Sequence, residues 1–115
     1  MFKTFQVSVV PEDENLPETL VELSEDTQNF DGSVVVTALT SVEIDFVYPL
    51  NRPFKVMVSN STGFTVADIV AAARENYQRV ALQEDAFWGH TLEELCLLDF
   101  TLEGNQVTLA VEAVC

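Results

Sequence analysis

The chain has 115 residues, of which 48% are hydrophobic, enough for one domain with its own core and too many for a disordered chain. Nineteen Asp and Glu against five Lys and Arg give a formal net charge of −14, which disfavours binding to nucleic acid or to anionic membranes. No stretch approaches the roughly 20 apolar residues of a membrane span. We therefore expect a single domain over residues 1–115 that is cytoplasmic and binds neither nucleic acid nor membranes.

The acidic side chains are unevenly distributed. Eight of them lie between Glu12 and Asp31, a stretch without Lys or Arg, and their mutual repulsion favours a solvated loop. Solubility alone explains such a surface, although basic partner proteins or divalent cations would also suit it. Two cysteines, Cys96 and Cys115, are too few for a disulfide framework and favour a reducing compartment.

The N-terminal half shows the alternation of strands. Phe5 to Val9 alternates until Pro11, and the apolar cluster at 20–23 allows a short edge strand. Residues 34–48 keep one inward parity throughout, but a strand of that length is too long for this domain, so we expect a break near Thr40. After the reversal at 49–53, alternation resumes at 54–58 and predicts a hairpin.

The C-terminal half predicts the main helix and a second hairpin. Thr65 and Asp68 form a capping-box pattern, and an apolar stripe that includes Ile69 and Tyr77 predicts a helix over about 66–83. We expect the side chains off this stripe to be solvated; they are Arg74, Glu75, Gln78 and Arg79. Residues 91–94 predict a single helical turn. Gly104 and Asn105 predict a type II′ turn between two final strands, a C-terminal β-hairpin.

These elements predict an α+β fold of two layers. An antiparallel sheet packs against the one main helix at about 66–83, because the apolar stripe of the helix must cover one face of the sheet.

The densest group of chemically useful side chains is residues 87–94, which hold the only Trp and the only His. His90 could serve as a general acid or base that Glu93 or Glu94 orients, beside Trp88. The alternative is structural: Trp88 closes the end of the core, and His90 bonds a helix start or a loop carbonyl. Tyr77 between two arginines is a further candidate for binding, although the period places it on the buried stripe.

The sequence predicts no metal and no cofactor. His90 with Glu93 or Glu94 supplies two or three ligands in one turn, fewer than the four of a structural zinc site. The acidic run at 12–14 lacks the pattern of an EF-hand. The four glycines never cluster, so the chain has no loop to hold phosphates.

The chain resembles a group of uncharacterised small proteins from large DNA viruses and algae at Gly63-Phe64-Thr65, Tyr77, Trp88-Gly89-His90 and the run from Leu92 to Leu95. The resemblance covers roughly the C-terminal half and implies no activity. Similar sequences often carry an acidic residue after the Trp-Gly-His triplet, where this chain has Thr91. A viral or aquatic source would accommodate the acidic, Lys-poor composition.

Two functional hypotheses follow. The first is a protein-binding or self-assembling module, with a protein partner or a homo-oligomer formed through an uncovered sheet face or an edge strand. The alternative is a small enzyme with His90 as acid or base near Trp88 and Glu94. Mimicry of nucleic acid by residues 12–31 is a weaker idea, because that segment looks too loose to space carboxylates like phosphates.

Overall fold

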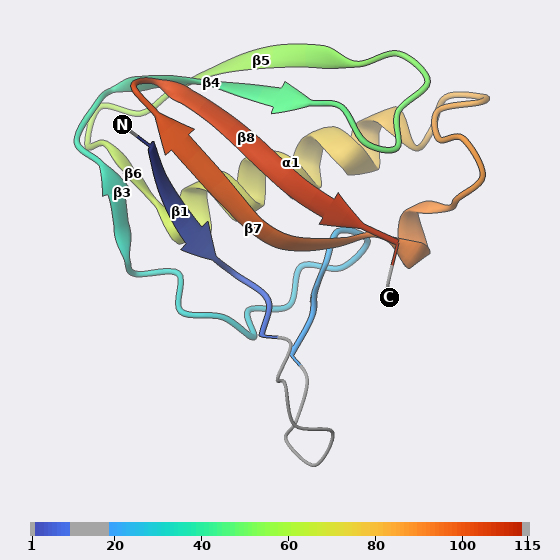
Figure 1. Ribbon diagram of the computed structural model, residues 1–115, viewed down its shortest axis with the longest axis horizontal. Coiled ribbons are helices and arrows are strands. Elements are labelled where there is room, and N and C mark those ends of the chain that lie inside the picture. The colour runs from blue at the N-terminus through green and yellow to red at the C-terminus, as the bar shows by residue number, and fades with distance from the viewer. Residues whose placement is uncertain (1, 10–18, 114–115) are drawn as a thin grey trace.

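The computed structural model describes residues 2–9 and 19–113 (Figure 1). Much of the predicted acidic loop, 12–18, lies outside the described residues. Residues 25–29 of the same stretch are exposed and irregular, as predicted. The elements are, in chain order, β1 (Phe2–Gln6), β2 (Val21–Glu22), β3 (Val35–Thr37), β4 (Ser41–Phe46), β5 (Phe54–Ser59), β6 (Phe64–Thr65), α1 (Val66–Val80), the 3₁₀ turn η1 (Leu92–Glu94), β7 (Cys96–Glu103) and β8 (Gln106–Glu112).

The main sheet has the strand order β1-β7-β8-β4-β5, and β2 also pairs with β7. The pair of β4 and β8 is parallel, with Ile44 opposite Val107, whereas the other pairs are antiparallel. The prediction of an antiparallel sheet is therefore wrong at this one junction. Alternation along each strand reports which face is buried but not the direction of a partner far away in sequence.

Both predicted hairpins are confirmed. β7 and β8 pair around Gly104, whose φ of +62° belongs to the first central residue of a type II′ turn. β4 pairs with β5 from Ser41 to Phe46. The long run at 34–48 breaks as expected, and the separated β3 pairs with β6 outside the main sheet.

The helix begins as predicted and ends three residues earlier. Thr65 Oγ1 accepts from the Asp68 amide, and Asp68 Oδ2 accepts from the Thr65 amide, a complete capping box. α1 ends at Val80. The predicted last turn follows as a 3₁₀-type turn, in which Gln83 N–H donates to the Val80 carbonyl three residues earlier at 2.9 Å.

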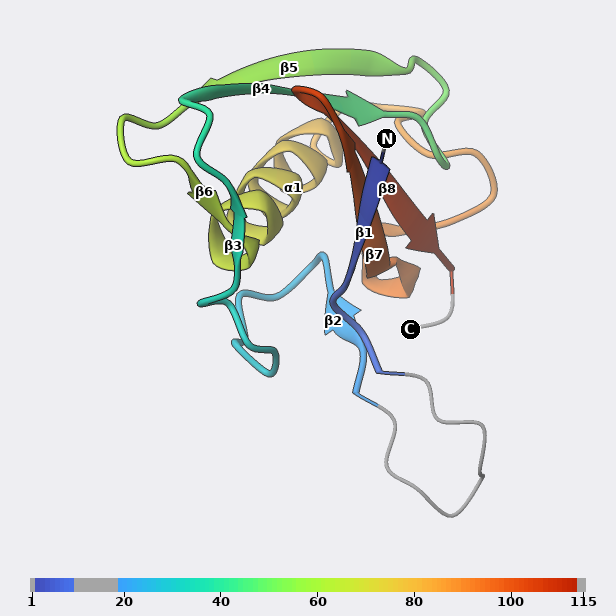
Figure 2. The same cartoon turned by 60° about the vertical axis from the view of Figure 1, so that its left-hand side comes forward.

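One face of α1 packs on the sheet and completes the core. Ile69, Ala73 and Tyr77 are buried together with Ile44 and Phe46, and the Phe46 and Tyr77 rings lie 5.5 Å apart. Figure 2 shows that the strands curl around the helix, with β4 and β5 on one side, β1, β7 and β8 on another, and β3 and β6 on a third. The α+β class with one main helix is confirmed, but a flat two-layer description is too simple.

Arg74 is buried, contrary to the prediction of a solvated side chain. The segment from β2 to Phe30 lies over this side of α1, and Arg74 Nε donates to the Glu22 carbonyl at 2.9 Å. Its guanidinium carbon lies 5.8 Å from the centre of the Phe30 ring. Desolvation lowers the pKa of Arg74, and nearby acidic side chains, Asp26 first, oppose that shift. Helical periodicity identified the side of the helix that meets the sheet, but not this second covered side.

Cys96 is buried and bonded in a disulfide. Disulfides are typical of oxidising compartments, whereas the cytoplasm is reducing. The disulfide therefore does not support the predicted cytoplasmic location, which stays a prediction. Within the described residues, no helix is long and apolar enough to span a bilayer.

Candidate functional site

The predicted site residues lie where two segments meet. The turn between β4 and β5 runs beside the loop that leaves α1, and backbone bonds join the two segments. Trp88 N–H donates to the Pro49 carbonyl, and Asn51 N–H to the Ala86 carbonyl, both at 3.0 Å. We call the side chains that gather at this junction the aromatic–imidazole cluster: Tyr48, Trp88, His90 and Glu94.

His90 lies at the centre of the cluster. Its Nδ1 is 3.1 Å from Glu94 Oε2, and its Nε2 is 3.3 Å from the Tyr48 hydroxyl. With Glu94 ionised, the imidazole donates from Nδ1 to the carboxylate, and neutral Nε2 then accepts from the phenol. A carboxylate, an imidazole and a hydroxyl therefore form one continuous chain. This order of groups can pass or hold a proton at the Tyr48 oxygen.

Glu94 is oriented by η1 as well as by His90. Its Oε1 accepts from both the backbone N–H and the hydroxyl of Thr91, each at 3.2 Å, which completes the predicted second capping box. The hydrogen bond from His90 is the largest cause that lowers the pKa of Glu94, followed by the Thr91 amide. The carboxylate is therefore ionised at neutral pH and accepts a hydrogen bond from His90.

Trp88 does not close the core, so that structural prediction is wrong. The side chain is 52% exposed and meets the Tyr48 ring edge-on at 5.5 Å. Phe87 takes the inward place instead, with its ring 6.2 Å from the Tyr77 ring. Since neighbouring side chains in an extended segment point to opposite sides, Trp88 faces outward.

Tyr77 lies in the core, at 1% exposure, and so does not offer a binding surface. Its hydroxyl donates to the Tyr48 carbonyl at 2.7 Å, and it thereby supports the cluster from below. Arg74 and Arg79 do not form one cationic spot with it, since Arg74 lies at Phe30 and Arg79 at Phe54.

His90 also borders a surface cleft of about 510 Å³ between the end of α1 and the loop around Phe87. Only two side chains that could ligate a metal meet here among the described residues, His90 and Glu94. Among residues 2–9 and 19–113, no group of three or more His, Cys, Asp or Glu is arranged to hold a metal ion.

A second surface feature was not predicted. A groove of about 520 Å³, which we call the β1 groove, runs between β1 and the segment before β3. Sequence parity placed Val34 inward, but this side chain is 44% exposed and borders the groove. The residues that line it are Lys3, Thr4, Phe5, Gln6, Val7, Val9, Thr19, Asn29, Phe30, Asp31, Val34 and Val66.

Comparisons of the chain with protein-family models, curated proteins and solved structures gave no significant match.

Proposed function

We propose that the protein binds an extended segment of a partner protein, which adds a strand to the free edge of β1. The observation that supports this function most directly is the β1 groove, because it places apolar side chains beside an edge of β1 with which no described strand pairs. Strand addition of this kind takes affinity from main-chain hydrogen bonds and specificity from pockets for alternate side chains.

The free edge follows from the pairing. Among the described strands, β1 pairs with β7 alone and β3 with β6 alone, and the two strands lie on either side of α1 (Figure 2). Val7 N–H donates to the Leu98 carbonyl of the β7 side. Since N–H groups alternate sides along a strand, those of Thr4 and Gln6 point away from β7 and are available to a partner.

The apolar side chains and the charge around the groove restrict which kinds of segment it would bind. Val9 and Val34 border the groove and are about half exposed, which favours a segment with apolar residues at alternate positions. Hydrogen bonds from Ser33 lower the pKa of Asp31 at the rim, so this carboxylate is ionised at neutral pH. With a net charge of −14 for the chain, a basic segment is favoured over an acidic one.

The test uses an acetylated, amidated peptide of alternating lysine and valine and maps the amide shifts of the protein by NMR. We expect saturable shifts in β1 and at residues 34–37. Thr4→Pro removes an outward N–H and should weaken binding about tenfold or more. Met57→Pro is the matched control, because it changes β5, the strand at the opposite end of the main sheet, and should leave the affinity within about twofold.

The same titration can reject the proposal. Shifts confined to other surfaces, or equal affinity for a copy of the peptide with methylated backbone nitrogens, would show that no strand is added. Light scattering separates the self-assembling version: a concentration-dependent dimer that Thr4→Pro abolishes would identify a second copy of this chain as the occupant.

A small enzyme remains the second candidate, and the chain of Glu94, His90 and the Tyr48 hydroxyl supports it. An activated aryl ester is a suitable probe, since its hydrolysis reports general-base or nucleophilic reactivity. His90→Asn should reduce hydrolysis to the buffer rate and Glu94→Gln should reduce it in part. Equal rates in all three proteins would eliminate this candidate.

We also propose, from the sequence pattern alone, kinship with the small proteins of large DNA viruses and algae.

A further inference from the structure

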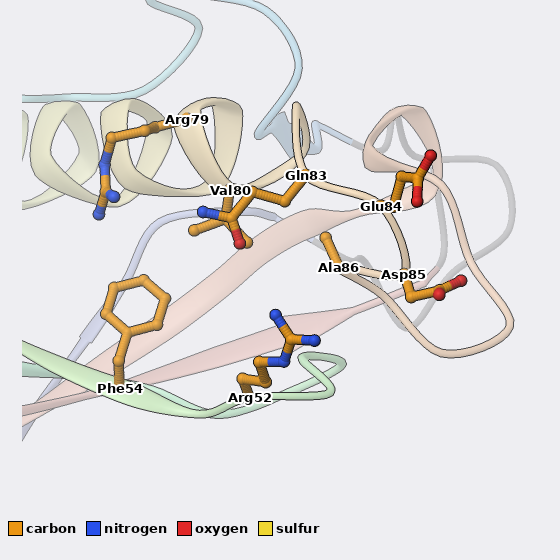
Figure 3. Close-up of a pocket in the computed structure, with 8 residues that line it drawn as sticks. All are labelled: Arg52, Phe54, Arg79, Val80, Gln83, Glu84, Asp85 and Ala86. Carbon is orange, nitrogen blue, oxygen red and sulfur yellow. The ribbon is translucent and has the colours of Figure 1, made fainter.

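A third hollow in the surface, which we call the arginine cleft, has a volume of about 230 Å³. It lies between the end of α1, the start of β5 and the turn at 83–86 (Figure 3). Its lining residues are Arg52, Phe54, Arg79, Val80, Gln83, Glu84, Asp85 and Ala86. It shares no residue with the β1 groove, so an inference about it does not depend on the proposed function.

Two of the five Lys and Arg side chains of this acidic chain face this cleft. Arg52 and Arg79 approach it from opposite walls (Figure 3). Among the described residues, neither forms an ion pair with a carboxylate. Placing two like charges at one small cleft is unfavourable, and an anion between them would offset that repulsion.

Arg79 is held in position. Its Nη2 donates to Asn76 Oδ1 at 2.9 Å, and buried Asn76 is itself fixed by a bond from Nδ2 to the Ala72 carbonyl at 2.8 Å. Its guanidinium carbon lies 5.8 Å from the centre of the Phe54 ring. An arginine oriented in this way retains other N–H donors for a ligand and loses little entropy when it binds one.

Phe54 supplies an apolar wall that is equally fixed. The Phe46 ring stacks on it at 4.8 Å with an interplanar angle of 9°, the Arg79 guanidinium lies over it, and Phe54 borders the cleft. The cleft therefore combines an aromatic side chain with two guanidinium groups.

The two acidic residues of the lining lie at its rim. Glu84 and Asp85 turn their carboxylates away from the guanidinium groups (Figure 3). The backbone there is set by Asp85, with φ +56°, whose carbonyl accepts a hydrogen bond from Asn51 Nδ2. The rim thus leaves the positive side chains as the charges nearest to the interior.

We propose that the arginine cleft binds a small aromatic monocarboxylate. Arginine guanidinium groups match the geometry of a carboxylate, and Phe54, Val80 and Ala86 offer apolar contacts for the aromatic part. A cavity of about 150 Å³ holds benzene, so 230 Å³ suits one ring that carries an acid group. The net charge of −14 repels polyanions such as nucleoside triphosphates far more than a monoanion.

The test is an NMR titration of the full chain with phenylacetate, and with phenylacetamide as the neutral analogue of the same shape. We expect saturable shifts at 52–54 and 79–86 with phenylacetate and at least about tenfold weaker binding of the amide. Arg79→Gln and Arg52→Gln should each weaken phenylacetate about tenfold. Phe54→Leu should weaken it less, because the apolar contact is partly kept.

Lys55→Gln is the matched control, since Lys55 neighbours Phe54 but lies with Glu43 and Asp45, each 3.7 Å away. It removes the same charge and should leave the affinity within about twofold. The proposal is overturned by equal binding of the amide, by an equal loss in Lys55→Gln, or by the absence of saturable shifts up to about 20 mM ligand. Circular dichroism of each variant confirms that the fold is retained.

Discussion

The hydroxyl of Tyr77 joins the helix to the turn that carries Tyr48. Burial raises the pKa of this phenol, because its ionised form would lie in the core. Tyr77→Phe keeps the ring but leaves the Tyr48 carbonyl without this donor, and we expect it to lower the free energy of unfolding by about 1 kcal/mol in urea denaturation. Tyr48→Phe, which loses only the partly exposed bond to His90, should cost less than about 0.5 kcal/mol. An equal cost for the two would contradict the assigned role.

The lowered pKa of Glu94 makes the free energy of unfolding depend on pH in the acid range. Its folded pKa is lowered from the ordinary value of 4.5, so its contribution is present above that value and is lost as pH falls through the lower folded pKa. In urea denaturation at a series of pH values, Glu94→Gln should remove this part of the acid-side decline. Glu93→Gln, an exposed neighbour in the same turn, should leave the profile unchanged. Asp99 acts in the opposite direction, because desolvation raises its pKa and protonation then favours the folded state.

At the scale of elements, two turn glycines with positive φ should respond differently to substitution. Gly104, at φ +62°, has open space where a Cβ would lie, so Gly104→Ala should cost about 1 kcal/mol of unfolding free energy for the backbone alone. At Gly63, φ +83°, a Cβ would lie 2.6 Å from the Thr37 carbonyl oxygen. Gly63→Ala should therefore cost more than about 2 kcal/mol. Similar melting temperatures for the two variants would contradict this reading of the β3–β6 contact.

The helix illustrates how far local pattern reaches. Capping and the apolar stripe predicted where α1 begins and that Ile69 and Tyr77 are buried. They did not predict that Arg74 is covered, because β2 and Phe30 come from another part of the chain. An apolar stripe identifies one buried side of a helix. A second side can be covered through polar contacts, and these produce no hydrophobic periodicity in the sequence.

For the whole molecule, the net charge of −14 implies self-repulsion that the fold must overcome. Salt screens such repulsion over about 10 Å at 0.1 M, so raising sodium chloride from low concentration to about 0.5 M should raise the melting temperature. The pairs of exposed Lys55 with half-buried Glu43 and Asp45 weaken at the same time, but pairs open to solvent on one side contribute little. A melting temperature that falls with salt would show that ion pairs, and not repulsion, dominate.

The candidate sites divide in the same way between local and distant contacts. The sequence offered either Glu93 or Glu94 as the partner of His90, because all three residues lie close together in the chain, and the structure places Glu94 there. The third member, Tyr48, is 42 residues away from His90 and no spacing rule links them. Phe87, and not Trp88 as predicted, turns toward the core, because the neighbouring turn decides which of two adjacent side chains meets the core.

By itself, the sequence determined the class of fold, one helix and two hairpins, because periodicity, capping and turn chemistry act over a few residues. The tertiary structure alone decided the parallel pair of β4 and β8, the edge of β1 that pairs with no described strand, and the meeting of Arg52 with Arg79. Each of these features joins segments that are distant in the chain. Their placement depends on how the strands curl around α1, and no local pattern records that path.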